Sequence, residues 1–238
     1  MTVEYQRRLE KHYDELKWLY CELYPNGQGR FEELCASMEQ WYKERNKKWK
    51  ALDRKREKQK DWYKSQKMLG MMLYIDAFAD NISGLEKKLD YLKELGVNQI
   101  QCMPVYEFEE CGKTKVNYWG YGKGFYFAPK KAYAYGKSAV RELKDMVRAC
   151  HSQGIEVVLE MPFIPGISAN YVTECLRFYM LEYHVDGFVL NPYNVPWEQL
   201  IEDPFLKDIK LMQKDDGFQN VMRRFLKGDE NMVNDVIW

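Results

Sequence analysis

The sequence predicts an α/β protein: a parallel sheet of four or five strands with helices between them, preceded by a helical N-terminal extension. From residue 68 onward, short apolar runs alternate with amphipathic helical segments. The expected strands are continuously apolar, which is typical of a parallel sheet buried on both faces. Two of the helical segments are followed by Gly96 and Gly154, and glycine commonly ends a helix. Hydrophobic residues make up 46% of the chain and charged residues 30%, which indicates a substantial core rather than a disordered chain.

Residues 1–67 form the predicted helical extension. Apolar residues recur there at spacings of three and four, as on one face of a helix: Leu9, Tyr13, Leu16, Leu19 and Leu23. The proline and glycine of segment 24–27 end that helix. A second helical run begins near Phe31, with Trp49 and Leu52 further along, so we expect two helices.

The end of this extension is basic. Residues 43–67 hold 12 Lys and Arg against 4 Asp and Glu. Over the whole chain, 36 basic residues balance 36 acidic ones, which argues against a globally basic nucleic-acid binder. We therefore interpret the basic run as a solvated helix face and expect no nucleic-acid partner.

Five strands are expected in the second part of the chain, at residues 71–75, 97–105, 155–161, 185–190 and, more weakly, 209–212. Leu85, Leu89 and Leu92 mark one intervening helix, and further helices are expected at about 140–154 and 172–183. A doubly wound sheet and a (β/α)-barrel both fit this alternation. No Gly-x-Gly-x-x-Gly follows the first strand, so a nucleotide site has little support.

Cysteine and histidine are sparse and scattered. The six cysteines include no Cys-x-x-Cys pair and the three histidines are not spaced as metal ligands, so we expect free thiols, no metal and no cofactor. No apolar stretch reaches the ~18 residues that a membrane span needs, and the first ten residues lack a secretory signal. These features predict a cytoplasmic protein that does not bind a membrane.

Several segments, in chain order, resemble the α-amylase superfamily, glycoside hydrolase family 13. Residues 1–105 are similar to amylosucrases, notably Leu-Gly-Met-Met-Leu-Tyr-Ile-Asp-Ala-Phe-Ala-Asp at 69–80. Later segments resemble the debranching members, the pullulanases and isoamylases: Asn-Tyr-Trp-Gly-Tyr at 117–121, Val-Asp-Gly-Phe-Val-Leu-Asn at 185–191 and Arg-Arg-Phe-Leu-Lys-Gly-Asp at 223–229. This resemblance implies a TIM-barrel-type fold. Because only four or five strands are expected, the barrel would be partial. It assigns residues 68–238 to the barrel. A complete barrel takes ~250 residues, so either the chain is part of a longer protein or a partial barrel survives with a partner.

The family motifs are degenerate at the positions that would carry catalysis. The family nucleophile, an Asp after the fourth barrel strand, is matched by Asn191, and its neighbouring Arg by Val189. Glu160 matches the Asp of the third-strand motif, whose sugar-binding His is matched by Pro165. The general acid falls at Gln213 or Lys214, and the family's last motif has no counterpart before Trp238. Since several positions differ together, the resemblance implies a decayed site rather than a single substitution.

Sugar binding could outlast catalysis. Tyr118, Trp119 and Tyr121 lie in the loop after the second strand, and the family Tyr that matches Tyr121 stacks under a sugar. The alternative is that these rings only cap the core.

Three hypotheses follow. The first is a catalytically silent family 13 homologue that binds an α-glucan or oligosaccharide at most, and associates with itself through an open barrel edge. The second is an active α-glucan hydrolase or transglycosylase whose acid is relocated to Glu107, Glu109, Glu110 or Glu160. The third is an interaction module whose helical arm, residues 4–62, binds a protein.

Overall fold

The computed structural model describes residues 3–59, 61–65, 67–111, 116–136, 138–207, 209–214, 224 and 226–228. The chain divides into two compact units, Met1–Trp62 and Tyr63–Trp238. Positions 223, 225 and 229 of the segment 223–229, which the sequence analysis compared with debranching enzymes, lie outside the described residues. Among those residues, no helix has the length and apolarity to cross a bilayer.

The first unit contains three helices in its described part, where the sequence predicted two. They are α1 (Val3–Leu23), α2 (Gln28–Glu44) and α3 (Lys47–Lys58). The expectation of one long second helix is wrong because Asn46 begins a new helix: its side chain accepts a hydrogen bond from the backbone N–H of Lys48 at 2.8 Å. Phe31 is the packing centre between α1 and α2, with its ring 5.4 Å from Tyr13 and 5.6 Å from Tyr20.

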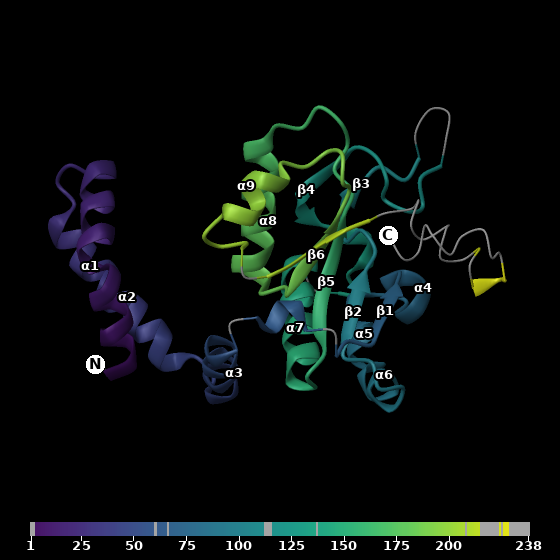
Figure 1. Ribbon diagram of the computed structural model, residues 1–238, viewed down its shortest axis with the longest axis horizontal. Coiled ribbons are helices and arrows are strands. Elements are labelled where there is room, and N and C mark those ends of the chain that lie inside the picture. Colours follow the sequence, from purple (N-terminus) through teal and green to yellow (C-terminus); the bar gives the residue numbers. More distant parts are fainter. Residues whose placement is uncertain are drawn as a thin grey trace. The chain divides into compact units, whose positions relative to one another are not determined.

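The second unit is built on a sheet of five parallel strands. They are β1 (Gly70–Leu73), β2 (Gln99–Cys102), β5 (Glu156–Met161), β6 (Gly187–Leu190) and β7 (Lys210–Gln213). Figure 1 shows them side by side, and their order, β1-β2-β5-β6-β7, is the order of the chain. A doubly wound sheet would place its first strand inside the sheet, so that alternative is wrong.

Helices connect these strands. They are α4 (Ile75–Ala79), α5 (Ile82–Glu86), α6 (Leu89–Glu94), α7 (Ala139–Ser152), α8 (Ala169–Tyr183) and α9 (Trp197–Glu202), with the single turn η2 (Lys131–Tyr133) before α7. Another single turn, η1 (Trp62–Lys64), precedes β1. The expected helix through Leu85, Leu89 and Leu92 is broken between α5 and α6. The N–H groups of Lys87 and Lys88 bond three residues back, which tightens the turn there. The three leucines are nevertheless buried as expected.

The two faces of the sheet differ in chemistry. One face carries the apolar residues of the hydrophobic core, such as Ile100, Leu159 and Phe188. The other face carries polar side chains, among them the buried Gln99, Glu160 and Lys210. This polar face is unusual for a protein interior, because a buried charge is costly unless it is paired.

Lys210 is paired at the amino ends of the strands. Its ammonium lies 2.8 Å from the side-chain oxygen of Gln99 and forms an ion pair with Glu156. On β6, the strand between β5 and β7, Gly187 lies opposite Lys210. A side chain at Gly187 would come within 2.5 Å of Lys210 Cβ, so this position requires glycine.

Asp186 makes structural hydrogen bonds near the amino ends of the strands. It accepts a bond from the backbone N–H of Val157 at 2.8 Å and lies 2.7 Å from Nε2 of His151. These contacts tie α7 to strands β5 and β6.

An antiparallel hairpin, which the sequence pattern did not predict, follows β2. It consists of β3 (Tyr106–Phe108) and β4 (Gly124–Pro129). Lys130 is 2% exposed behind it, 3.0 Å from Glu110 and 3.6 Å from Glu107. The two carboxylates thereby neutralise a buried lysine and fix the hairpin.

Candidate functional site

The carboxyl edge of the sheet holds a buried carboxylate with three polar partners. Glu160 is 1% exposed. The hydroxyl of Tyr121 donates to its Oε1, and Nε2 of Gln101 donates to its Oε2 at 3.1 Å. The ammonium of Lys214 lies 2.8 Å from Oε1 and 2.6 Å from the Tyr121 hydroxyl. Both carboxylate oxygens therefore accept hydrogen bonds, which offsets the cost of burying the charge.

The parallel topology gathers these residues from distant parts of the chain. Gln101 lies in β2, Glu160 lies in β5 and Lys214 directly follows β7. Carboxyl ends of parallel strands meet at one edge of a sheet, which is where α/β proteins place their sites. Because β6 lies between β5 and β7, the Lys214 side chain has to reach across it to Glu160.

The charges of this cluster cancel. Lys214 supplies one positive charge to one carboxylate, and its Nζ also lies 4.5 Å from the centroid of the Tyr121 ring. Within the described part of the chain, the hydrogen bonds and ion pairs of Glu160 reach no second carboxyl group. The cluster is thus a neutral, hydrogen-bonded unit.

Asn191, which the sequence analysis matched to the family nucleophile, follows β6 and is held in a local turn. Its side-chain oxygen accepts a hydrogen bond from the backbone N–H of Tyr193 at 2.9 Å. An amide that accepts from its own chain two residues on stabilises the turn. Of the three degenerate positions expected from the sequence, the structure brings Glu160 and Lys214 together and leaves Asn191 in this turn.

Three aromatic side chains lie exposed beside the cluster. Tyr118, Trp119 and Tyr121 are 68%, 55% and 39% exposed, and we call them the aromatic platform. The loop that carries them is well held: the side-chain oxygen of Asn117 accepts from Gly120 N at 3.1 Å, and the buried Tyr106 hydroxyl donates to the Gly120 carbonyl. Gly120 has a φ of 78°, a conformation that favours glycine.

Sequence reasoning missed two members of this region, Tyr74 and Gln101. The Tyr74 ring lies 5.3 Å from the ring of Trp119, so it packs against this member of the aromatic platform. Burial, and then the negative charge of Glu160, raise the pKa of the Tyr74 hydroxyl, so it stays neutral. Both residues could have been found from the sequence, because each lies at or near the carboxyl end of an expected strand.

The described residues contain no group of three or more His, Cys, Asp or Glu side chains able to hold a metal ion. All six cysteines are free thiols. Glu107 and Glu110, two acids considered for relocated catalysis, lie against Lys130 at the hairpin.

No family model matches the chain, but curated relatives do. It is 30% identical over 159 residues to isoamylase 1 of Oryza sativa subsp. japonica, covering 44% of this chain and 20% of the relative. It is 36% identical over 97 residues to the glycogen operon protein GlgX homolog of Mycobacterium tuberculosis, covering 38% of this chain and 14% of the relative. The chain thus spans about a fifth, or less, of these relatives.

Solved structures are similar in fold. The α-amylase of Geobacillus thermoleovorans matches with a TM-score of 0.51 and 15% identity, over 67% of this chain and 49% of that one. A pullulanase of Paenibacillus barengoltzii matches with a TM-score of 0.51 and 17% identity, over 59% of this chain and 34% of that one. The resemblance to glycoside hydrolase family 13 is confirmed over part of the chain. The expected likeness to amylosucrases stays a prediction.

Proposed function

We propose that this chain is an α-amylase-type protein of α-glucan metabolism that binds glucan without hydrolysing it. We further propose that residues 68–238 form part of a (β/α)-barrel and residues 1–67 a helical extension. The sequential order of the five parallel strands supports the barrel, since successive barrel strands are neighbours. The observation that carries the functional proposal is the Glu160–Lys214 pair beside the aromatic platform.

The chemistry of the cluster supports the proposed lack of catalysis. A retaining glycosidase needs two carboxyl groups ~5–5.5 Å apart, one as nucleophile and one as acid. Here the partner of Glu160 is an ammonium group, and the nucleophile position holds the neutral amide of Asn191. Lys214 also hydrogen-bonds Tyr121, so both polar groups nearest to Glu160 are already committed.

Glucan binding is supported by the aromatic platform. An exposed, well-held ring offers an apolar surface to the CH face of a sugar, and its neighbouring polar groups can bond hydroxyls. The fold relatives point the same way: one structure is a pullulanase complexed with maltotetraose and another an α-amylase complexed with acarbose.

Retention on immobilised glycogen tests this proposal. We expect retention of the unmodified chain and its loss in Trp119→Ala. Trp41→Ala is the matched control, because Trp41 is 63% exposed against 55% for Trp119 but lies in the helical unit. Passage of the unmodified chain through the gel, or equal loss in both variants, would contradict glucan binding at the platform.

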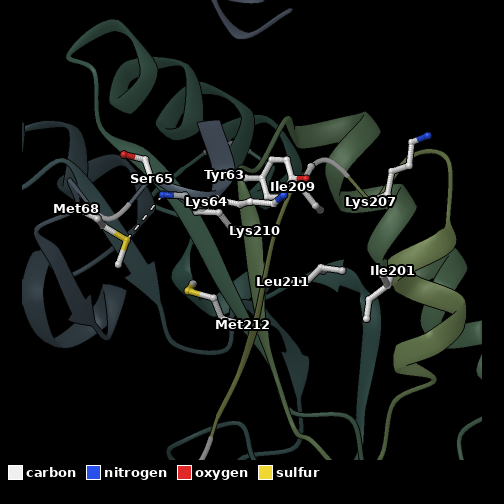
Figure 2. A pocket seen from close by; sticks show the side chains of 10 residues that line it. All are labelled: Tyr63, Lys64, Ser65, Met68, Ile201, Lys207, Ile209, Lys210, Leu211 and Met212. Carbon is white, nitrogen blue, oxygen red and sulfur yellow. Dashed lines mark hydrogen bonds between the residues drawn. The ribbon is translucent and has the colours of Figure 1, made fainter. Parts of the chain in front are cut away.

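We also propose self-association through the open edges of the sheet. In the described part of the chain, no strand pairs with the outer edge of β1 or of β7. A hollow of about 640 Å³ lies along β7, lined by Tyr63, Met68, Ile201 and Leu211 among others. Figure 2 shows the side chains that line it. Met72 on β1 is 62% exposed. Unpaired strand edges attract other chains.

Sedimentation velocity measures this association. Leu211→Lys, at the open edge, should shift the chain toward monomer, while Leu181→Lys on the exposed surface of α8 should not. A monomer at every concentration would contradict the proposal.

A protein-interaction function remains the second candidate, because the helical unit exposes large apolar side chains. Trp18, Leu23 and Trp41 are 61%, 76% and 63% exposed. A chain that binds no glucan, but whose residues 1–62 bind a protein partner, would favour it. The cytoplasmic location and the absence of a nucleic-acid partner stay predictions.

A further inference from the structure

A second hollow lies close to the aromatic platform. It has a volume of about 420 Å³ and is lined by Lys123, Gly124 and Tyr126 of the hairpin, and by Ile164, Ile167, Ser168 and Tyr171 around the start of α8. We call it the hairpin pocket. The first residue of its lining, Lys123, follows Tyr121 by two positions, and Gly124 follows by three. Three residues of extended chain span at most ~11 Å, so Gly124 lies within that distance of Tyr121.

The aromatic walls of the hairpin pocket are fixed. Tyr126 is 2% exposed, and its hydroxyl donates to the Gly122 carbonyl at 3.0 Å and accepts from Ile164 N at 3.2 Å. Since its polar atom is satisfied, the ring contributes an apolar wall. Tyr171 is 38% exposed and packs edge-on against Phe127 at 5.2 Å.

The rim of the pocket is polar. Lys123 is exposed, and within the described residues no ion pair or hydrogen bond engages its ammonium. The hydroxyl of Ser168 accepts a bond from Tyr171 N at 3.3 Å and keeps its proton to donate. Gly124 is required here, because a side chain would come within 2.6 Å of the Tyr106 ring.

A small concave site with an aromatic wall, aliphatic floor and a few polar groups at its rim suits a hydroxylated ring. We propose that the hairpin pocket holds a further glucosyl unit of the same α-glucan chain that lies on the aromatic platform. This inference rests on the proposed glucan binding. It makes the ligand an oligosaccharide of several units, because one sugar fills only one of the two sites. A sugar chain that occupies the aromatic platform and the hairpin pocket at once binds more tightly than one that occupies a single site, because its second contact is intramolecular.

Isothermal titration with glucose, maltose, maltotriose and maltohexaose tests this inference. For the unmodified chain, affinity should rise with the length of the sugar. Tyr171→Ala should lower the maltohexaose-to-maltose affinity ratio about tenfold, which corresponds to about 1.4 kcal/mol. Because loss of Tyr171 also removes packing, Ile167→Trp provides a second variant that fills the pocket instead of emptying it. Trp119→Ala should weaken the binding of every sugar.

The outcomes separate the two proposals. If no sugar binds the unmodified chain, the proposed function fails and this inference fails with it. If sugars bind, but both Tyr171→Ala and Ile167→Trp keep the unmodified affinity ratio while circular dichroism shows them folded, the hairpin pocket is not a glucosyl site and only this inference is overturned.

Discussion

Replacing Lys214 by Met should destabilise the second unit strongly, because it leaves Glu160 charged and buried without its cation. Breaking a buried ion pair by removing one partner costs ~3–5 kcal/mol. The Lys214 side chain is 27% exposed and that of Glu160 is 1% exposed, so water screens the pair partly. We therefore expect a loss at the lower end, about 3 kcal/mol in the free energy of unfolding.

Urea denaturation followed by circular dichroism measures this loss. With a slope of ~2 kcal/mol per M, the midpoint should fall by ~1.5 M. The double variant Glu160→Gln/Lys214→Met should recover most of the stability, because a neutral amide replaces the unpaired charge.

Lys144→Met is the matched control for this experiment. Lys144 also forms an ion pair, with Glu182, but the two side chains are 30% and 44% exposed. Exposed pairs contribute ~0–1 kcal/mol, so this variant should change stability little. Equal effects of Lys214→Met and Lys144→Met, or no recovery in the double variant, would refute the idea that Lys214 neutralises a buried charge.

Three further predictions concern catalysis, packing and pH. Asn191→Asp alone should release no reducing sugar from glycogen above background, since Lys214 would still stand at the position that the resemblance assigns to the general acid; turnover that scales with protein would contradict this. Gly187→Ala should lower the free energy of unfolding, measured by urea denaturation, by about 3 kcal/mol, because the added methyl group would collide with Lys210 on the neighbouring strand β7. An unchanged urea midpoint would contradict this and show that the two strands move apart to make room. Burial opposes ionisation of Asp203, but its hydrogen bonds from Arg177 and the backbone lower its pKa. This group therefore stabilises the fold above the unfolded pKa of ~3.9 and ceases to do so as pH falls through its lower folded pKa. Arg177→Ala should reduce the loss of unfolding free energy between neutral and acidic pH. An unchanged dependence of the unfolding free energy on pH would contradict the role given to the Arg177–Asp203 pair.

The sheet was predictable because short segments rich in apolar residues alternate with helices, two of which are followed by Gly96 and Gly154. The polar residues on one face of the sheet, such as Gln99 and Glu160, were not expected from that pattern. The sequential strand order follows from connections that place successive strands together. The break between α5 and α6 was not predictable, since the leucine spacing is helical on both sides of it. The hairpin was also missed, because its partners are separated by a long loop and one of them spans only three residues, Tyr106–Phe108.

The candidate site was predictable in part. The family resemblance located Glu160, Lys214 and Tyr121, and the structure joins them by hydrogen bonds. Their pairing was not predictable, because it depends on the reach of one lysine across a neighbouring strand. Tyr74 and Gln101 were missed because the resemblance assigns neither of them a role at the site, although Tyr74 lies within the segment 69–80 that carries the resemblance.

Nuclear magnetic resonance of maltohexaose incubated with the purified chain tests binding without hydrolysis in one sample. Saturation transfer from the protein reports binding, and the anomeric proton signals report any new reducing ends. We predict transfer to the sugar protons that is lost in Trp119→Ala, with the maltohexaose intact after prolonged incubation. Shorter sugars appearing at a rate that scales with the amount of protein, or no transfer at any sugar concentration, would contradict the account.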